Sequence, residues 1–153
     1  MKTWRNYRRM DRGARRLAWE TAAALLVTRI GLRWAGLRRS RDLLVRLTTR
    51  PGTRVTGLLA GPEVAVAQRV AAIQEAVSGH LLWQPSCLEK SLILWWQLRR
   101  LGIAAELRMG ARKRAGRFEA HAWVELEGVV LNDSGDTHMH FAPFDGAILT
   151  LES

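Results

Sequence analysis

Three residues carry the chemistry that this sequence offers: one thiol, one imidazole and one carboxylate. Cys87 is the only cysteine, His121 follows it after 34 residues, and Asp133 stands twelve residues further on. A thiolate attacks carbonyl carbons, an imidazole takes the thiol proton, and a carboxylate orients the imidazole. This order of residues predicts a cysteine hydrolase that acts through a thioester.

The residues around Cys87 predict that it begins a helix. Ser86 followed three residues later by Glu89 is a capping-box signature, with Pro85 just before it. The first turn of a helix favours an anion because it has unpaired N–H groups and the positive end of the dipole. We expect the Cys87 N–H to form half of an oxyanion hole, with Gln84 as a candidate second donor. A buried structural cysteine is the alternative interpretation.

Alternating apolar residues predict that His121 lies on a strand over 118–126. The apolar positions are Ala120, Ala122, Val124 and Leu126. His121 therefore points to the opposite face of the strand. That face is either the site or an ordinary solvent-exposed surface.

The turn after this strand decides which residue faces His121. A two-residue turn at 127–128 would require a positive φ at Glu127, which is costly, whereas a three-residue loop at 126–128 requires it only at Gly128. In the three-residue register, His121 lies directly opposite Asp133, with Cβ atoms about 4.5–5.5 Å apart. The two-residue turn would place Asp133 on the other face.

Other candidate residues have a weaker pattern. Trp83 and Trp123 flank the proposed triad and are candidates for a substrate groove, with buried packing as the alternative. His138 and His140 alternate as metal ligands sometimes do, but no acid pair completes a set, so surface histidines are favoured. Asp136 is the reserve acid if the register is wrong. No phosphate-binding loop is present, and no metal or cofactor is expected.

The hydrophobic pattern places helices before strands. Helices are expected over 11–37, 40–47, 63–77 and 87–101. The last of these is apolar on almost every side, which is typical of a buried central helix. Strands are expected over 103–109, 118–126, 129–133 and 147–151, with a basic loop at 110–116. This order predicts an α+β fold with an antiparallel sheet.

The composition is that of one globular domain. The chain has 153 residues, 48% of them hydrophobic, with seven Trp. A single cysteine excludes an internal disulfide and fits a reducing compartment. The apolar stretch 17–37 is interrupted by Glu20, Arg29 and Arg33, so we expect no membrane span. With no signal peptide recognised either, a cytoplasmic protein is expected.

Positive charge is concentrated in the first third of the chain. Residues 1–54 hold 15 Lys and Arg against three acids, a net charge of +12, whereas 55–153 hold nine against eleven, a net charge of −2. Such a lobe attracts nucleic acid, anionic lipid or an acidic polypeptide, and an Arg-rich composition alone explains it equally well. We divide the chain into a basic helical lobe at 1–60 and a catalytic core at 61–153.

Four segments share the order and spacing of a known family. They are 87–92 (CLEKSL), 98–110 (LRRLGIAAELRMG), 120–125 (AHAWVE) and 131–133 (LND). Together they resemble the lasso-peptide leader peptidases, which are transglutaminase-like cysteine proteases of the microcin J processing type. The resemblance covers about residues 80–135.

The resemblance implies a function and a set of partners. This family removes the leader from a ribosomally made precursor so that a partner cyclase closes the macrolactam. It implies a papain- or transglutaminase-like core, with Cys87 as nucleophile, His121 as base and Asp133 as orienting acid. The chain resembles the stand-alone protease half, which receives the leader from a separate recognition protein. The basic lobe is then expected to dock that protein and the leader, rather than nucleic acid.

Two alternatives stay open. The same fold supports a different acyl transfer, such as amide hydrolysis or transglutamination. A non-catalytic basic binding module also fits the positive charge of the N-terminal lobe, and nucleic acid is one ligand for such a module.

Overall fold

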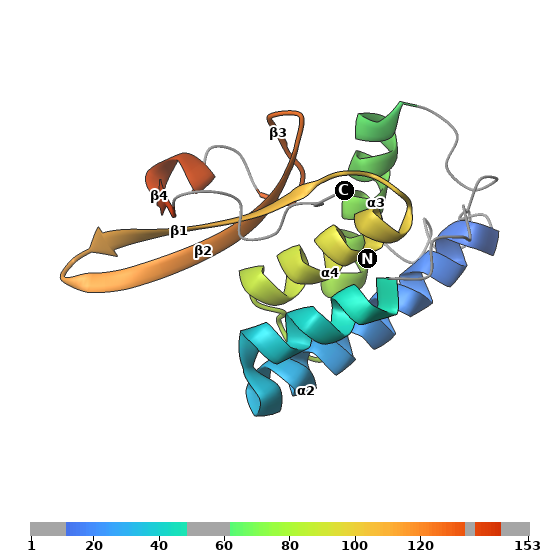
Figure 1. The fold of residues 1–153 in the computed structure, drawn as a ribbon, viewed down its shortest axis with the longest axis horizontal. Coiled ribbons are helices and arrows are strands. Elements are labelled where there is room, and N and C mark those ends of the chain that lie inside the picture. Colours follow the sequence, from blue (N-terminus) through green and yellow to red (C-terminus); the bar gives the residue numbers. More distant parts are fainter. Residues whose placement is uncertain (1–11, 49–61, 134–136, 145–153) are drawn as a thin grey trace.

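The structure is a computed structural model that describes residues 12–48, 62–133 and 137–144 (Figure 1). The strand expected at 147–151 and the reserve acid Asp136 lie outside the described residues.

The N-terminal helix α2, Arg12–Thr48, is bent into a hairpin of two arms (Figure 1). The bend is at Gly36, whose φ of 74° and ψ of 174° are not helical. At Gly31 an added Cβ would lie 3.0 Å from Ser40 Oγ, so the absence of a side chain lets the arms approach closely. The two helices expected on either side of Gly36 are therefore the two arms of α2. No helix in the described ranges is long and apolar enough to cross a membrane.

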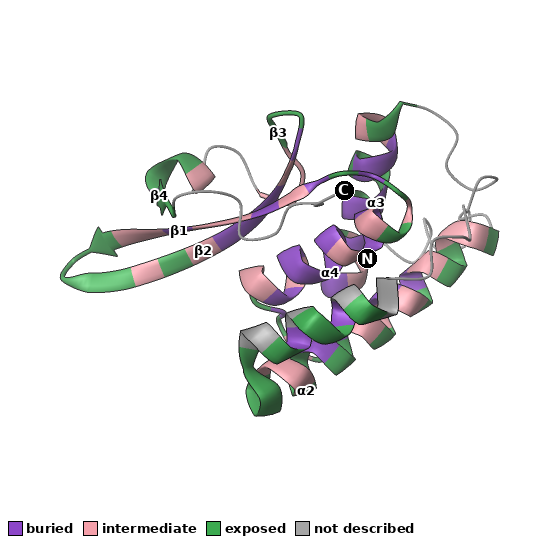
Figure 2. Cartoon of the chain, viewed as in Figure 1, coloured by how far each residue is buried: buried purple, intermediate pink, exposed green. Residues whose placement is uncertain are grey.

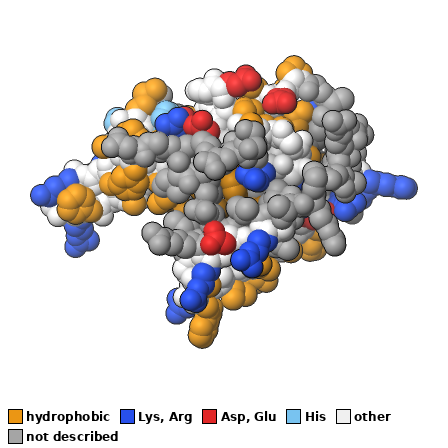
Figure 3. Space-filling view, in the orientation of Figure 1, with side chains coloured by type: hydrophobic (Ala, Val, Ile, Leu, Met, Phe, Trp, Pro, Cys, Tyr) orange, Lys and Arg blue, Asp and Glu red, His pale blue; other side chains and the backbone are white. Residues whose placement is uncertain are grey.

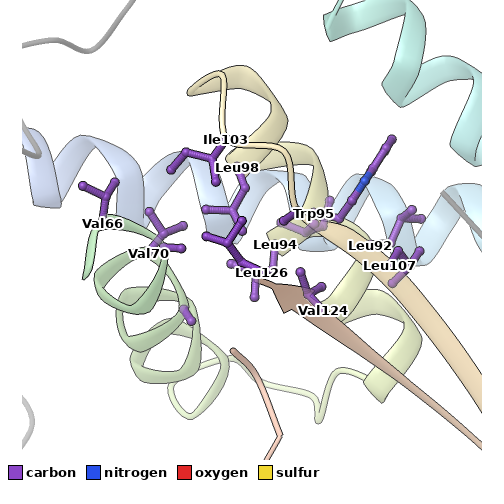
Figure 4. Packing of buried hydrophobic residues seen from close by; sticks show 14 of the residues in the cluster. Val66, Val70, Leu92, Leu94, Trp95, Leu98, Ile103, Leu107, Val124 and Leu126 are labelled. Atoms are coloured by element: carbon purple, nitrogen blue, oxygen red, sulfur yellow. The ribbon is translucent and has the colours of Figure 1, made fainter. Parts of the chain in front are cut away.

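Helix α4, Cys87–Arg100, forms the centre of the molecule and packs beside α3, Glu63–Ser78. Its fully buried side chains include Leu92, Ile93, Leu94 and Leu98. They pack with apolar residues of α2, α3 and the sheet in one core (Figure 4). Figure 2 shows buried residues along α4 and the adjoining part of the sheet. The expectation of a buried central helix is confirmed.

One antiparallel sheet packs against α4 and completes the core that α2 and α3 also form. Its strands are β1 Glu106–Arg114, β2 Arg117–Leu126, β3 Val129–Val130 and β4 Ala142–Pro143, in the order β3-β2-β1-β4. The β1–β2 hairpin extends beyond the helices (Figure 1). Helices followed by an antiparallel sheet confirm the α+β class.

The basic segment 110–116, expected to be a loop, is mostly strand. β1 continues to Arg114, and only Ala115 and Gly116, with φ of 49° and 80°, form the turn. Backbone pairing with β2 includes Arg112 opposite Glu119, whose side chains form an ion pair at 2.6 Å. Charged side chains on an exposed hairpin are compatible with a strand, because the ladder bonds involve only the backbone.

The turn between β2 and β3 also differs from the expectation. Leu126 pairs with Val129, so the turn has two residues, Glu127 and Gly128, with φ of 50° and 76°. Two positive φ angles define a type I′ turn, whose twist matches that of the strands. The three-residue loop expected from the cost at Glu127 is therefore wrong, because hairpin twist outweighs that local cost.

Candidate active site

Cys87 is the first residue of α4, and the capping box that precedes it is present. Ser86 Oγ accepts a hydrogen bond from the Glu89 backbone N–H at 3.2 Å, and Glu89 Oε2 accepts one from the Ser86 N–H at 2.6 Å. Glu89 is buried, so these bonds hold the first turn in one conformation. The half-buried thiol of Cys87 therefore stands where the helix dipole favours an anion.

His121 lies on β2, and its Nε2 is 3.4 Å from Asp133 Oδ1. The Asp133 side chain is only 4% exposed. The two residues come together although the predicted register is wrong. β3 ends at Val130, the Leu131 N–H still donates to the Val124 carbonyl at 2.9 Å, and the bend over residues 131–133 brings the carboxylate to the imidazole. The expected partnership thus forms by a bend and not by cross-strand pairing.

Asn132 fixes this bend. Its Oδ1 accepts a hydrogen bond from the Val124 N–H at 2.8 Å, in place of a backbone partner from β3. Its Nδ2 donates to Ser91 Oγ at 2.8 Å, which joins the bend to α4. One side chain therefore holds the segment before Asp133 to both β2 and α4.

Ser91 connects the thiol-bearing helix to the histidine-bearing strand. Its buried Oγ donates to the carbonyl of Ala122 at 2.9 Å, and Ala122 is the neighbour of His121. Ser91 stands four residues after Cys87, so the two share one face of α4. This bond brings the start of α4 against the part of β2 that carries the imidazole.

Cys87, His121 and Asp133 line one cleft of about 610 Å³. One side of the cleft is formed by α3, and the other by α4, β2 and the segment after β3. The remaining lining residues are Gln68, Ala71, Ala72, Gln74, Glu75, Pro85, Lys90, Val130, Leu131 and Asn132. The buried side chain of Gln74 donates to the Lys90 carbonyl at 2.6 Å, which ties α3 to the first turn of α4.

Three other predicted site residues lie outside this lining. Gln84 is exposed. Trp83 packs at the edge of the core, with Arg29 5.5 Å from its ring centroid. Trp123 is 3% exposed and stacks beside the His121 ring, with 5.9 Å between centroids. Trp83 packs against the core cluster and Trp123 is buried in the sheet, and neither lines the cleft.

His138 lies beside Asp133 and outside the cleft lining, whereas the sequence pattern favoured a surface role for it. It lies on the short 3-10 helix η1, Thr137–His140, and its Nδ1 is 3.4 Å from Asp133 Oδ2. His140, on the same turn, is exposed. In the described part of the chain, no group of three or more His, Cys, Asp or Glu side chains could hold a metal ion.

Thiol, imidazole and carboxylate line one cleft, on a helix packed against an antiparallel sheet, and this set of groups is the one that nucleophilic catalysis by a thiol uses. The sequence model of the Transglutaminase-like superfamily matches residues 22–144 of the 153, and the chain belongs to this superfamily. The superfamily includes cysteine proteases and acyl transferases. No curated protein and no solved structure matches the chain well enough to count as a relative.

Proposed function

We propose that the protein is a cysteine endopeptidase that removes the leader from a ribosomally made lasso-peptide precursor. The observation that carries the proposal is the shared cleft of Cys87, His121 and Asp133, with 3.4 Å between His121 Nε2 and Asp133 Oδ1. The resemblance of four segments between residues 87 and 133 to the leader peptidases supplies the substrate class.

The orientation of His121 supports one role for each ring nitrogen. His121 Nε2 lies 3.4 Å from Asp133 Oδ1, and we propose that the other nitrogen, Nδ1, takes the Cys87 proton. The thiolate attacks the carbonyl carbon of the last leader residue, and the oxyanion accepts a hydrogen bond from the Cys87 backbone N–H. The C–N bond breaks as His121 returns the proton to the leaving amine. The leader remains on Cys87 as a thioester.

Water completes the cycle. His121 takes a proton from a water molecule, whose oxygen attacks the thioester carbon. The C–S bond breaks, and the leader leaves with a new carboxylate. The core peptide left in the first step with a free α-amine, which is the nucleophile that a macrolactam-forming cyclase requires.

The outer face of α2 supports a separate docking site for a recognition protein. Its exposed apolar side chains are Trp19, Leu26, Val27, Ile30 and Trp34, between 46% and 83% exposed. At 3.6 residues per turn these positions fall on one side of the helix, opposite the side that packs on the core. In Figure 3, hydrophobic and basic side chains lie together along the lower edge of the molecule, where α2 runs.

Basic side chains border this apolar stripe. Arg12, Arg15 and Arg33 are exposed on α2 beside it. An apolar stripe with a basic border fits a partner segment that is apolar on one side and acidic around it. We propose that the recognition protein with its bound leader docks here and delivers the scissile bond to the cleft.

Mass spectrometry of the precursor tests the peptidase function. A lasso-peptide precursor and its recognition protein, sought among the genes next to this one, are incubated with the wild-type protein and with Cys87→Ala. A single cut at the leader–core junction, lost in the variant, is the expected result. Deamidation or cross-linking of the precursor indicates the alternative acyl transfer, and binding without any covalent change indicates a non-catalytic module.

Pull-down with the recognition protein tests the docking surface. Trp19→Ser combined with Trp34→Ser is expected to weaken capture at least tenfold, because aromatic side chains carry much of the energy of an interface. Reversal of Arg15 and Arg33 to Glu is expected to weaken it in a salt-dependent manner. Phe118→Ser is the matched control, since this aromatic ring is 81% exposed on the distant hairpin. Unchanged capture by all variants contradicts docking on α2 and leaves the peptidase proposal standing.

A further inference from the structure

We propose that His138 is a positioning residue, which holds the carboxylate of Asp133 from the side opposite to His121. This inference rests on the proposed triad and adds a residue to it. Asp133 stands between two imidazoles, with Oδ1 at 3.4 Å from His121 Nε2 and Oδ2 at 3.4 Å from His138 Nδ1. Each imidazole thus faces a different oxygen of one carboxylate.

The burial of the Asp133 carboxylate explains why a second imidazole, that of His138, lies beside it. The Asp133 side chain is 4% exposed, and those of His121 and His138 are 17% and 18% exposed. A buried carboxylate is costly unless each oxygen meets a donor. Both contacts are 3.4 Å long and lack hydrogen-bond geometry. A small rotation of the two rings lets a neutral His138 donate from Nδ1 to Oδ2, while His121 donates to Oδ1.

A common ring surface supports both imidazoles. The Trp123 ring centroid is 5.9 Å from that of His121 and 6.0 Å from that of His138. The indole is itself fixed, because Trp123 Nε1 donates to Glu125 Oε1 at 2.7 Å. Arg108 in turn holds the other oxygen of Glu125 at 2.8 Å. Both imidazoles therefore pack against a buried Trp that is held in one orientation.

The residues that follow His138 anchor its segment to the sheet. The Phe141 N–H donates to the His138 carbonyl at 3.1 Å, and the Phe141 ring lies 5.1 Å from that of His121. β4 follows directly and pairs with β1 at Gly110, where an added Cβ would lie 2.8 Å from the Ala142 carbonyl oxygen. This close approach holds η1 over β2, so His138 is placed by the fold.

A donor at Oδ2 adds a restraint on the orientation of the carboxylate. The terminal torsion of Asp is broad and about twofold, so a carboxylate held at one oxygen can rotate. Held at both oxygens, Asp133 keeps Oδ1 on His121 Nε2, which fixes the tautomer with Nδ1 free to take the thiol proton. Loss of His138 should therefore lower the rate of the chemical steps without weakening substrate binding.

The test replaces His138 by Asn or Gln, whose amide N–H groups lie at different distances from the backbone. The Asn amide nitrogen superimposes on imidazole Nδ1, whereas the Gln amide nitrogen superimposes on Nε2. We expect His138→Phe and His138→Gln to lower kcat for precursor cleavage by about 10- to 100-fold with KM within about twofold. His138→Asn is expected to restore most of kcat. The matched control is His140→Phe on the same turn, which is expected to change neither value.

A second readout needs no peptide. The rate of Cys87 alkylation by iodoacetamide reports thiolate formation, with His121→Ala as the lower reference. We expect His138→Phe and His138→Gln between this reference and the wild type, and His138→Asn near the wild type. Equal alkylation rates in the wild type, Asn and Gln variants overturn the proposal, as does a KM increase with unchanged kcat. Failure of precursor cleavage alone, with the alkylation pattern intact, refutes the leader substrate but not the role of His138.

Discussion

Cys87 and the His121–Asp133 pair are held in place by two different kinds of structure. The thiol depends on the capping box, in which both hydrogen bonds join residues three apart in the chain. The imidazole and carboxylate depend on Asn132 and Ser91, residues 41 apart, and on the bond from Ser91 to Ala122, 31 residues away. The proposed nucleophile is placed by its neighbours in sequence, whereas the proposed base and its partner are placed by packing between α4 and β2.

This difference predicts how the two halves of the site respond to change. A substitution at the helix start removes local bonds and leaves the rest of the site in place. A substitution at the bend after β3 releases contacts among three elements at once, so it should affect both stability and the geometry of the base. The variants below test this distinction in order of decreasing expected effect.

Asn132→Ala is expected to have the largest effect. It leaves the buried N–H of Val124 without its acceptor and breaks the link to Ser91. An unpaired buried donor together with a lost hydrogen bond costs about 2–3 kcal/mol of unfolding free energy. Precursor cleavage should fall by at least about 100-fold, because the segment before Asp133 is no longer held. Chemical denaturation and cleavage kinetics measure the two effects.

If the Asn132→Ala variant cleaves the precursor at a rate within about twofold of the wild type, β3 alone positions Asp133. The comparison between the two halves of the site would then fail.

Ser86→Ala is expected to have an intermediate effect, confined to the thiol. Loss of an N-cap costs about 1 kcal/mol, and the first turn of α4 loosens around Cys87. Cys87 alkylation should slow several-fold. The control is Ser86→Asn, which retains a capping side chain and should behave as the wild type. Similar losses in both variants would mean that the hydroxyl acts on the thiol directly and not through the cap.

The β2–β3 turn should have the smallest effect on activity. Gly128→Ala places a side chain at a φ of 76° and should destabilise the protein by about 1 kcal/mol. Glu127→Asn, at a φ of 50°, should stabilise it by a few tenths of a kcal/mol, because Asn-Gly favours type I′ turns. Thermal unfolding measures both changes. Cleavage should stay within about twofold in each variant, and a larger change would mean that the turn positions Asp133 after all.

Local patterns predicted the parts of the molecule that local interactions determine. The capping box, the bounds of α3 and α4 and the strand carrying His121 follow from residue spacing within one element. The break in α2 follows from Gly36 in the same way. In each case the signal lies within about four residues of the feature that it predicts.

Long-range contacts determine the parts that sequence reasoning missed. The sequence predicts a strand over 129–133, but β3 covers only Val129–Val130. The Leu131 N–H still bonds to the Val124 carbonyl, and the Asn132 side chain then takes the place of a backbone acceptor for the Val124 N–H. The 3-10 helix with His138 has no periodic signal, and its place depends on β4 meeting β1 at Gly110. Asp133 was assigned to His121 from a wrong register, and only the bend that Asn132 fixes brings the two together.

One wall of the cleft is formed by a helix, α3, that can change in sequence independently of Cys87, His121 and Asp133. Helix α3 contributes Gln68 and Ala72 to the cleft but none of the three residues of the proposed triad. Both side chains are exposed, so they can change without loss of core packing. In the proposed peptidase, single substitutions on this one helix can therefore change substrate preference without touching the proposed triad. A mutant library restricted to these positions is the shortest route to a variant that accepts a different peptide.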